Sequence, residues 1–405
     1  MRKLDRREFL TVAAGTAAGL AGTGLQRERR EIFDLVISGG HLVDPAAGMN
    51  AALDIGITGG RVVQIAEHIL PSEGRRVIDA TGRIVAPGLI DVHVHVFDGV
   101  AQVGIQPDLI GVARGVTTLV DGGSAGATTF PGFRDYVARQ ARSRVYALLN
   151  ISMPGMTVPN ELTDLRYVDP EAAVRTIEEN RDIIVGIKVR MLAGIPGGGD
   201  VEVMRLTREA ADAAAVPITV HIGGQTSPLP RILDFLRPGD VVTHALRRQG
   251  SILDERGRVY AEVREAMARG IHLDVGHGRG NLDFDVAEAV LDQGIMPTTI
   301  SSDVHRGNVA GPVFDLPTTL SKFMNMGMTL EQVITAATAA PARIYDFGEP
   351  LGTLTPGAAA DIAIFDLVEG AHEFMDSGGK RRSGEQGLVP YAAFRSGRDF
   401  GSITR

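Results

Sequence analysis

Residues 88–97 read GLIDVHVHVF, an apolar segment rich in β-branched residues that contains two histidines. Such a run, introduced by Pro87 and Gly88, is typical of a buried strand. Side chains two positions apart on a strand point to the same side, so His93 and His95 face one side together. Two imidazoles buried together are costly unless each has a partner. The segment alone therefore leaves two interpretations open, a hydrogen-bonded pair in the core or two ligands of a metal ion.

Seven more apolar segments follow, and amphipathic stretches lie between them. One of these stretches, DPEAAVRTIEEN, starts with Asp169, which can cap a helix, and Pro170, which fits the first helical position. Strands that alternate with helices predict an α/β fold, and eight of them predict a closed (β/α)8 TIM barrel rather than an open sheet. The further predicted strands are residues 116–123, 145–152, 184–191, 217–224, 240–247, 271–278 and 297–304.

Both ends of the chain differ from this pattern. Residues 34–66 alternate short apolar runs with Gly, Asp and Pro turns, which predicts antiparallel β structure. Short strands and turns return towards the C-terminus. We therefore expect residues 31–87 and 346–405 to form one small β-sandwich domain, split in the sequence by the barrel. The barrel is expected at residues 88–345, close to the roughly 250 residues that such barrels need.

Residues 1–30 form a separate segment, in which Arg6 and Arg7 precede the uncharged stretch FLTVAAGTAAGLAGTGLQ. Paired arginines ahead of a modestly apolar stretch resemble a twin-arginine signal peptide, which predicts a periplasmic or secreted protein. A disordered N-terminus on a cytoplasmic protein is the alternative. The uncharged stretch is at the short edge of a membrane span of about 20 residues, and its glycines weaken a helix. We therefore expect no stable membrane anchor.

The composition excludes several classes of protein and of site. A net charge of -8 argues against nucleic-acid binding, since phosphate contacts need a concentrated positive surface. The absence of cysteine from all 405 residues excludes disulfides, thiolate metal ligands and cysteine nucleophiles. Any metal bound here must therefore be held by nitrogen and oxygen atoms.

Ionisable residues recur near the ends of the predicted strands. The chemistry of (β/α)8 barrels lies at the carboxyl ends of the strands, so side chains placed there converge above the barrel axis. Each such residue has a structural alternative, since a histidine can be a hydrogen-bonded core residue, a lysine can reach a carboxylate, and an aspartate can cap a segment. A full set at the strand ends of one barrel favours a metal centre instead. The set is His93, His95, Lys188, His221, His244 and Asp303.

The motifs around these residues resemble those of the amidohydrolase superfamily. APGLIDVHVH, GIKVR, ITVHIG, VVTHA and TISSDVH occur in this order, and the resemblance extends from Asp34 to about Phe400. Residues 274–308 and 314–338 are similar to its amidohydrolase/deacetylase branch, a group of dihydroorotase-like metallohydrolases. The resemblance implies a hydrolase of small esters or amides, in which a hydroxide that bridges two divalent metal ions, zinc in our interpretation, attacks a carbonyl carbon.

The resemblance also implies a role for each ligand. His93 and His95 would bind the more buried ion, and His221 and His244 would bind the more exposed one. Asp303 would bind the buried ion and serve as the catalytic acid and base.

The fourth predicted strand contributes two further expectations. By the same resemblance, Lys188 would be carboxylated by CO2 and would bridge both ions, since a carbamate is an anionic oxygen ligand whereas an ammonium repels cations. Arg190 lies two residues later on the same side of the strand, so it could hold the carboxylate of a small acyl substrate. An ion pair within the barrel rim is the alternative for this arginine. Further candidate substrate contacts are His277, Arg279, His305 and Asn308, and an apolar wall could come from Met153, Met156 and Tyr167.

Three other functions remain open at this point. A cyclic amidohydrolase, similar to dihydroorotase or hydantoinase, would use the same ligands on a ring substrate. A mononuclear deaminase on the same barrel would not need Lys188, and a non-catalytic scaffold would be expected to have lost ligands, whereas the set here is whole. The sequence leaves the natural substrate, the native metal and the formation of a homo-oligomer undetermined.

Overall fold

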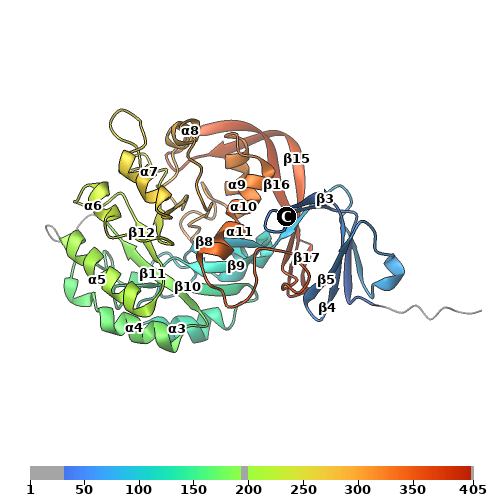
Figure 1. The fold of residues 1–405 in the computed structure, drawn as a ribbon, viewed down its shortest axis with the longest axis horizontal. Helices are drawn as coiled ribbons and strands as arrows, with labels where there is room; N and C mark the ends of the chain where they lie inside the picture. Colours follow the sequence, from blue (N-terminus) through green and yellow to red (C-terminus); the bar gives the residue numbers. More distant parts are fainter. Residues whose placement is uncertain (1–31, 193–198, 403–405) are drawn as a thin grey trace, which may run out of the picture.

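The computed structural model describes residues 32–192 and 199–402 (Figure 1). The twin-arginine signal expected at residues 1–30 lies outside the described residues. Within the two described ranges, no helix is both long enough and apolar enough to cross a membrane. The architecture is a barrel with smaller β sheets beside it (Figure 1).

A parallel sheet of seven strands forms the barrel wall, and each strand pairs with the next one along the chain. The strands are rich in Val, Ile and Leu and are buried along most of their length, as a parallel sheet covered by helices requires. Their bounds are β8 (Leu89–Val94), β9 (Val116–Asp121), β10 (Arg144–Asn150), β11 (Ile184–Arg190), β12 (Ile218–His221), β13 (Val241–Thr243) and β14 (His272–Asp274).

Residues 297–304, predicted as the eighth strand, close the barrel without forming a regular strand. Parallel bridges join Val304 to Val94 of β8 and Thr299 to Asp274 of β14. The segment is therefore bonded to both edges of the sheet. The fold is the closed (β/α)8 barrel that the sequence predicts, with an irregular eighth segment in place of a regular strand.

Helices fill most of the connections between the barrel strands. The helix α4 (Pro170–Glu179) begins as predicted, because the Asp169 carboxylate accepts a hydrogen bond from Ala172 N at 2.9 Å and Pro170 takes the first position. The other helices are α2 (Pro107–Ile110), α3 (Phe130–Phe133), α5 (Gly199–Ala214), α6 (Leu229–Leu233), α7 (Ala261–Ala268), α8 (Phe284–Asp292), α9 (Leu316–Met324), α10 (Leu330–Ala336) and α11 (Ala339–Ile344).

Two further sheets have the strand orders β5-β4-β1-β6 and β17-β16-β15-β7-β2-β3. The pairs formed within residues 34–66 are antiparallel, as predicted, whereas β1 pairs with β6 and β2 with β7 in parallel. A parallel neighbour requires a crossover connection, which the intervening strands of the opposite sheet supply. The strands are β1 (Leu35–Ser38), β2 (His41–Asp44), β3 (Met49–Ala52), β4 (Asp54–Thr58), β5 (Arg61–Ala66), β6 (Val77–Asp79), β7 (Ile84–Pro87), β15 (Ile362–Met375), β16 (Arg381–Arg395) and β17 (Arg398–Ser402).

The hairpin formed by β15 and β16 extends from the small sheets along the barrel towards α8 (Figure 1). Its residues Phe374 and Leu388 belong to the same hydrophobic core as the barrel. Leu388 N donates to Ser321 Oγ of α9 at 2.9 Å. The C-terminal segment, which we expected to build only the small domain, thus also covers one side of the barrel.

Candidate metal centre

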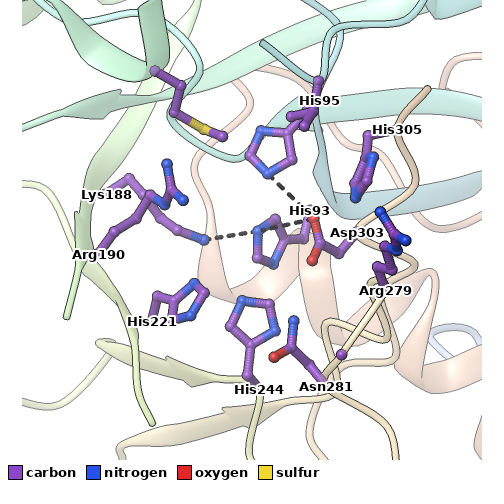
Figure 2. Close-up of a pocket in the computed structure, with 13 residues that line it drawn as sticks. His93, His95, Lys188, Arg190, His221, His244, Arg279, Asn281, Asp303 and His305 are labelled. Carbon is purple, nitrogen blue, oxygen red and sulfur yellow. Dashed lines mark hydrogen bonds and ion pairs between the residues drawn. The ribbon is translucent and has the colours of Figure 1, made fainter. Parts of the chain in front are cut away.

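A cavity of ≈ 190 Å³ lies at the carboxyl ends of the barrel strands, and all six predicted ligands line it (Figure 2). The ligands come from β8 and the residue after it, from β11 and β12, from the residue after β13 and from the eighth segment, residues 297–304. Five distant parts of the sequence therefore converge on one space. The cavity is also lined by Val103, Met156, Arg190, Arg279, Gly280, Asn281 and His305.

The centre of this group is formed by His93, His244 and Asp303, whose ligand atoms all lie within 4.8 Å of one another. Asp303 Oδ1 lies 3.2 Å from His95 Nε2 and 3.8 Å from His93 Nε2. The ring of His221 packs against that of His244, with 4.0 Å between the ring centroids. Nitrogen and oxygen atoms at these separations suit a small divalent cation.

Two of these residues have a backbone conformation that L-amino acids rarely adopt. His244 has φ 68° and Asp303 has φ 47°. A left-handed residue other than glycine costs about 1–3 kcal/mol, and such residues cluster at functional sites. His244 directly follows β13, Asp303 lies in the irregular eighth segment, and both side chains line the cavity.

Hydrogen bonds behind the cavity orient the imidazole rings. His93 Nδ1 lies 3.1 Å from Thr243 Oγ1, and this hydroxyl donates to Asp274 Oδ2 at 2.6 Å. The Thr243 hydroxyl must therefore accept from His93 Nδ1, which leaves the Nε2 lone pair of His93 towards the cavity. His244 Nδ1 donates to Gly276 O at 2.7 Å, with the same consequence. Metal-binding histidines are usually held in this way through their second nitrogen.

Burial keeps these rings neutral. Burial first, and then the nearby Lys188, lower the pKa of His93 to about 4. Burial likewise lowers the pKa of His221 and His244 well below the usual value. For Asp303, burial raises the pKa, but the surrounding imidazoles outweigh it and hold the pKa well below its usual range. Neutral imidazoles and an ionised carboxylate are the forms that a metal ion requires.

Unsatisfied polar atoms also fit a cation. Within the described part of the chain, the buried atom His244 Nε2 makes no hydrogen bond, and Asp303 Oδ1 has the contacts with His93 and His95 but no hydrogen bond. Buried polar atoms without a hydrogen bond are rare and call for a ligand or ion.

Lys188 is fully buried, and its Nζ lies 2.8 Å from His93 Nε2. Burial lowers the pKa of Lys188 to about 7, so a neutral amine is accessible near neutral pH.

The candidate substrate contacts divide into two groups. Arg190, Arg279 and His305 line the cavity. Arg190 also forms the ion pair that the sequence left as its alternative, since its Nη1 lies 3.2 Å from Oε1 of the buried Glu161. An arginine has five N–H donors, so this pair leaves others for a ligand.

His277 and Asn308 are not among the lining residues. His277 Nε2 lies 2.6 Å from Nζ of the buried Lys322. Asn308 donates to Asp303 O at 2.9 Å and accepts from His305 N at 2.8 Å, so it braces the loop that carries Asp303. Sequence reasoning missed Asn281 and Val103, which do line the cavity. The polar run GRGN before α8 was the available signal for Asn281.

The sequence of the chain matches the model of the amidohydrolase family over residues 84–395. A deacetylase of Agrobacterium fabrum is 36% identical over 334 residues, which cover 81% of this chain and 82% of the relative. A crystal structure described as an adenine deaminase has a TM-score of 0.86 and 33% identity, over 91% of this chain and 100% of that one. A crystal structure described as a dihydroorotase has a TM-score of 0.83 and 32% identity, over 91% and 99%. The protein therefore belongs to the amidohydrolase family and is a hydrolase.

Proposed function

We propose that the protein is a binuclear metal-dependent hydrolase that cleaves a small ester or amide, of the acyl or deacetylase type. The observation that carries this proposal is the convergence of four histidines, one aspartate and one buried lysine on a single cavity. The similarity to a relative named deacetylase supports the choice of an acyl substrate.

The ligand set provides for two ions. His93, His95 and Asp303 would hold the more buried ion, and His221 and His244 the more exposed one. When bound, two divalent ions, zinc in our proposal, supply Lewis acidity for the carbonyl oxygen and lower the pKa of an attacking water towards about 7.

Lys188 would complete the centre after reaction with CO2. The neutral amine adds to the carbon of CO2, a new N–C bond forms, and one proton leaves the nitrogen. The product would be a carbamate, whose single negative charge is shared by two oxygens and which could bind cations that an ammonium would repel. The full burial of Lys188 and its lowered pKa of about 7 support this step, since the amine must be deprotonated to react.

Asp303 would move the proton during hydrolysis. Its carboxylate is ionised and lies at the centre of the cavity, so it can accept the proton of the attacking water. It would then pass this proton to the oxygen or nitrogen that leaves when the acyl bond breaks.

Two arginines of the cavity support an anionic substrate. Arg190 and Arg279 both line the cavity, and Arg190 pairs there with the buried Glu161. A guanidinium with free donors binds a carboxylate by charge-assisted hydrogen bonds. We propose that the acyl substrate carries a carboxylate, as in an N-acyl amino acid or an acylated hydroxy acid.

Metal analysis and a substrate panel test the proposal together. Protein purified without chelator should contain two ions per chain and should hydrolyse members of a panel of N-acyl amino acids, acylated hydroxy acids and cyclic amides. One ion per chain with deamination of a base would favour a mononuclear deaminase, and the absence of metal would favour a scaffold.

A second candidate is hydrolysis of a cyclic amide. The dihydroorotase structure with 32% identity supports it, and the same attack on a carbonyl would open a ring. The panel separates the two candidates, because an acyl hydrolase releases a free acid from linear substrates and leaves the cyclic amides intact.

We also propose that residues 1–30 direct export by the twin-arginine route, on the basis of Arg6 and Arg7. Replacement of both arginines by lysine should retain the protein in the cytoplasm. Equal amounts of wild-type and variant protein in the periplasm would contradict this proposal.

A further inference from the structure

The end of the β15–β16 hairpin reaches a loop of the barrel that lines the cavity. We call residues 376–380 the hairpin tip and residues 275–283, between β14 and α8, the seventh loop. Ser377 Oγ accepts hydrogen bonds from Asn281 N at 3.2 Å and Leu282 N at 3.1 Å. It lies 3.1 Å from Gly278 O, to which its hydroxyl can donate. One hydroxyl therefore bonds the seventh loop at its middle and near its C-terminal end.

Further bonds fasten the hairpin tip in place. Ser377 N donates to Leu282 O at 2.9 Å. The buried Asp376 accepts from Phe284 N at 3.2 Å, at the start of α8, and from Lys380 N at 2.9 Å within the tip itself. Asp376 thus shapes the tip and attaches it to the helix that follows the seventh loop.

Charged side chains surround this attachment. Lys380 Nζ lies 2.5 Å from Asp285 Oδ1, and Arg382 Nη2 lies 2.9 Å from the same oxygen. Arg382 also contacts Glu288, and its guanidinium lies 5.2 Å from the centroid of the Phe284 ring. Exposed pairs of this kind contribute little stability each, but together they fix the direction from which the hairpin approaches.

The seventh loop is packed tightly against the centre of the cavity. A Cβ atom on Gly278, which has φ 50°, would lie 2.2 Å from Asp303 Oδ2 and 2.8 Å from Asn281 Nδ2. The loop backbone therefore touches the Asp303 carboxylate, and its next residues, Arg279 and Asn281, line the cavity (Figure 2). A small shift of this loop would move both side chains relative to Asp303.

We infer that Ser377 is a positioning residue that determines substrate specificity, because it holds the loop from which Arg279 and Asn281 face the cavity. This inference rests on the proposed function, since it concerns how the same cavity selects its substrate. The specificity of the barrel site is then set in part by the C-terminal hairpin. Binding of substrates through a carboxylate or other polar group at Arg279 and Asn281 depends on this hydroxyl. The positions of the proposed metal ligands do not depend on it.

The first test compares Ser377→Ala with the wild type. The amides of Asn281 and Leu282 lose their acceptor, so hydrogen exchange in the peptide 277–284 should become faster. KM for the best carboxylate-bearing substrate of the panel should rise about five- to tenfold, with kcat changed less than about twofold, as expected for loss of one half-buried hydrogen-bond centre. Metal content should stay at the wild-type value.

Three controls separate positioning from general destabilisation. Ser383→Ala changes an exposed serine of the same hairpin and should leave exchange and KM unchanged. Ser377→Thr keeps the hydroxyl and should recover most of the wild-type KM. In the Arg279→Ala/Asn281→Ala background, Ser377→Ala should have no further effect on KM.

The inference is overturned if Ser377→Ala leaves KM and exchange unchanged, or if it raises KM equally in the double-alanine background. Failure of the proposed function would look different. In that case the wild type would turn over no acyl substrate, while the exchange measurement would still report whether Ser377 holds the loop.

Discussion

The wall of the cavity built by strand residues differs from the wall built by loop residues in what holds its side chains. His93 and His221 lie on strands that are buried along most of their length. Arg279 and Asn281 lie on the seventh loop, which is held by a hairpin about 95 residues further along the chain. The strand wall is thus fixed by the barrel alone, whereas the loop wall depends on the C-terminal segment. This division suggests that hydrolysis and substrate choice can be altered separately.

Asp303→Asn should have the largest effect on turnover, because it removes the proposed proton acceptor at the centre of the cavity. The amide can still offer an oxygen to a cation but cannot accept the proton, so kcat should fall by about 10²–10⁴-fold while metal content stays near that of the wild type. Steady-state kinetics and metal analysis measure the two effects. Asp315→Asn, at the cap of α9, serves as the control. Full activity of the Asp303→Asn variant would remove Asp303 from the proposed mechanism.

Asp274→Asn tests the support behind the same wall. Asp274 accepts hydrogen bonds from Thr243 and Ser301, and through Thr243 it orients His93. Loss of such a partner typically lowers metal affinity by about 10- to 100-fold, which competition with a chelator measures.

The matched control for this variant is Asp44→Asn. Asp44 is equally buried, but it accepts from Leu354 N in the small domain, far from the cavity in the fold. This variant should lose stability without loss of metal affinity. Equal metal affinities of the two variants would contradict the assigned role of Asp274.

The double variant Arg190→Met/Glu161→Gln tests whether a residue of the strand wall also binds the substrate carboxylate. The double change avoids leaving a buried carboxylate unpaired. KM for carboxylate-bearing substrates should rise about tenfold, the value of one charge-assisted hydrogen bond, and KM for neutral esters should change little. Arg208→Met removes an arginine that pairs with Asp240 outside the cavity and should leave both values unchanged. An equal rise for neutral and anionic substrates would exclude carboxylate recognition by Arg190.

Lys322→Met should have the smallest effect on turnover and a clear effect on stability. Burial lowers the pKa of Lys322 from 10.5 to about 7. Between these values the unfolded chain binds more protons than the folded one, so the free energy of unfolding rises from about pH 7 to about pH 10. This contribution of Lys322 is lost as the pH falls. The variant lacks this contribution, so its stability should rise less over the same range. Urea unfolding at both pH values measures the difference.

The control for this prediction is Lys380→Met, which removes an exposed lysine. Its pH dependence should follow that of the wild type. Because Lys322 contacts His277 at the start of the seventh loop, a changed KM in Lys322→Met would show that the loop wall also depends on α9.

The sequence predicted the strand wall better than the loop wall. Each proposed ligand lies in or near the end of an apolar segment, and a closed barrel brings the carboxyl ends of its strands to one place, so position along the segment was enough to predict the convergence. The position of a loop side chain has no such rule. His277 and Asn281 are four residues apart on the seventh loop, yet of the two only Asn281 lines the cavity, because the ring of His277 is bonded to Lys322 of α9 instead.

By itself the sequence predicted the barrel and, through the resemblance of its motifs, the amidohydrolase family, because periodicity and motifs are local properties of the chain. The set of metal ligands stays a prediction. Only the tertiary structure decided which loop residues line the cavity and that the β15–β16 hairpin supports them. The hairpin tip and the seventh loop are about 95 residues apart, and individual hydrogen bonds join them. Such bonds follow no repeating pattern in the sequence.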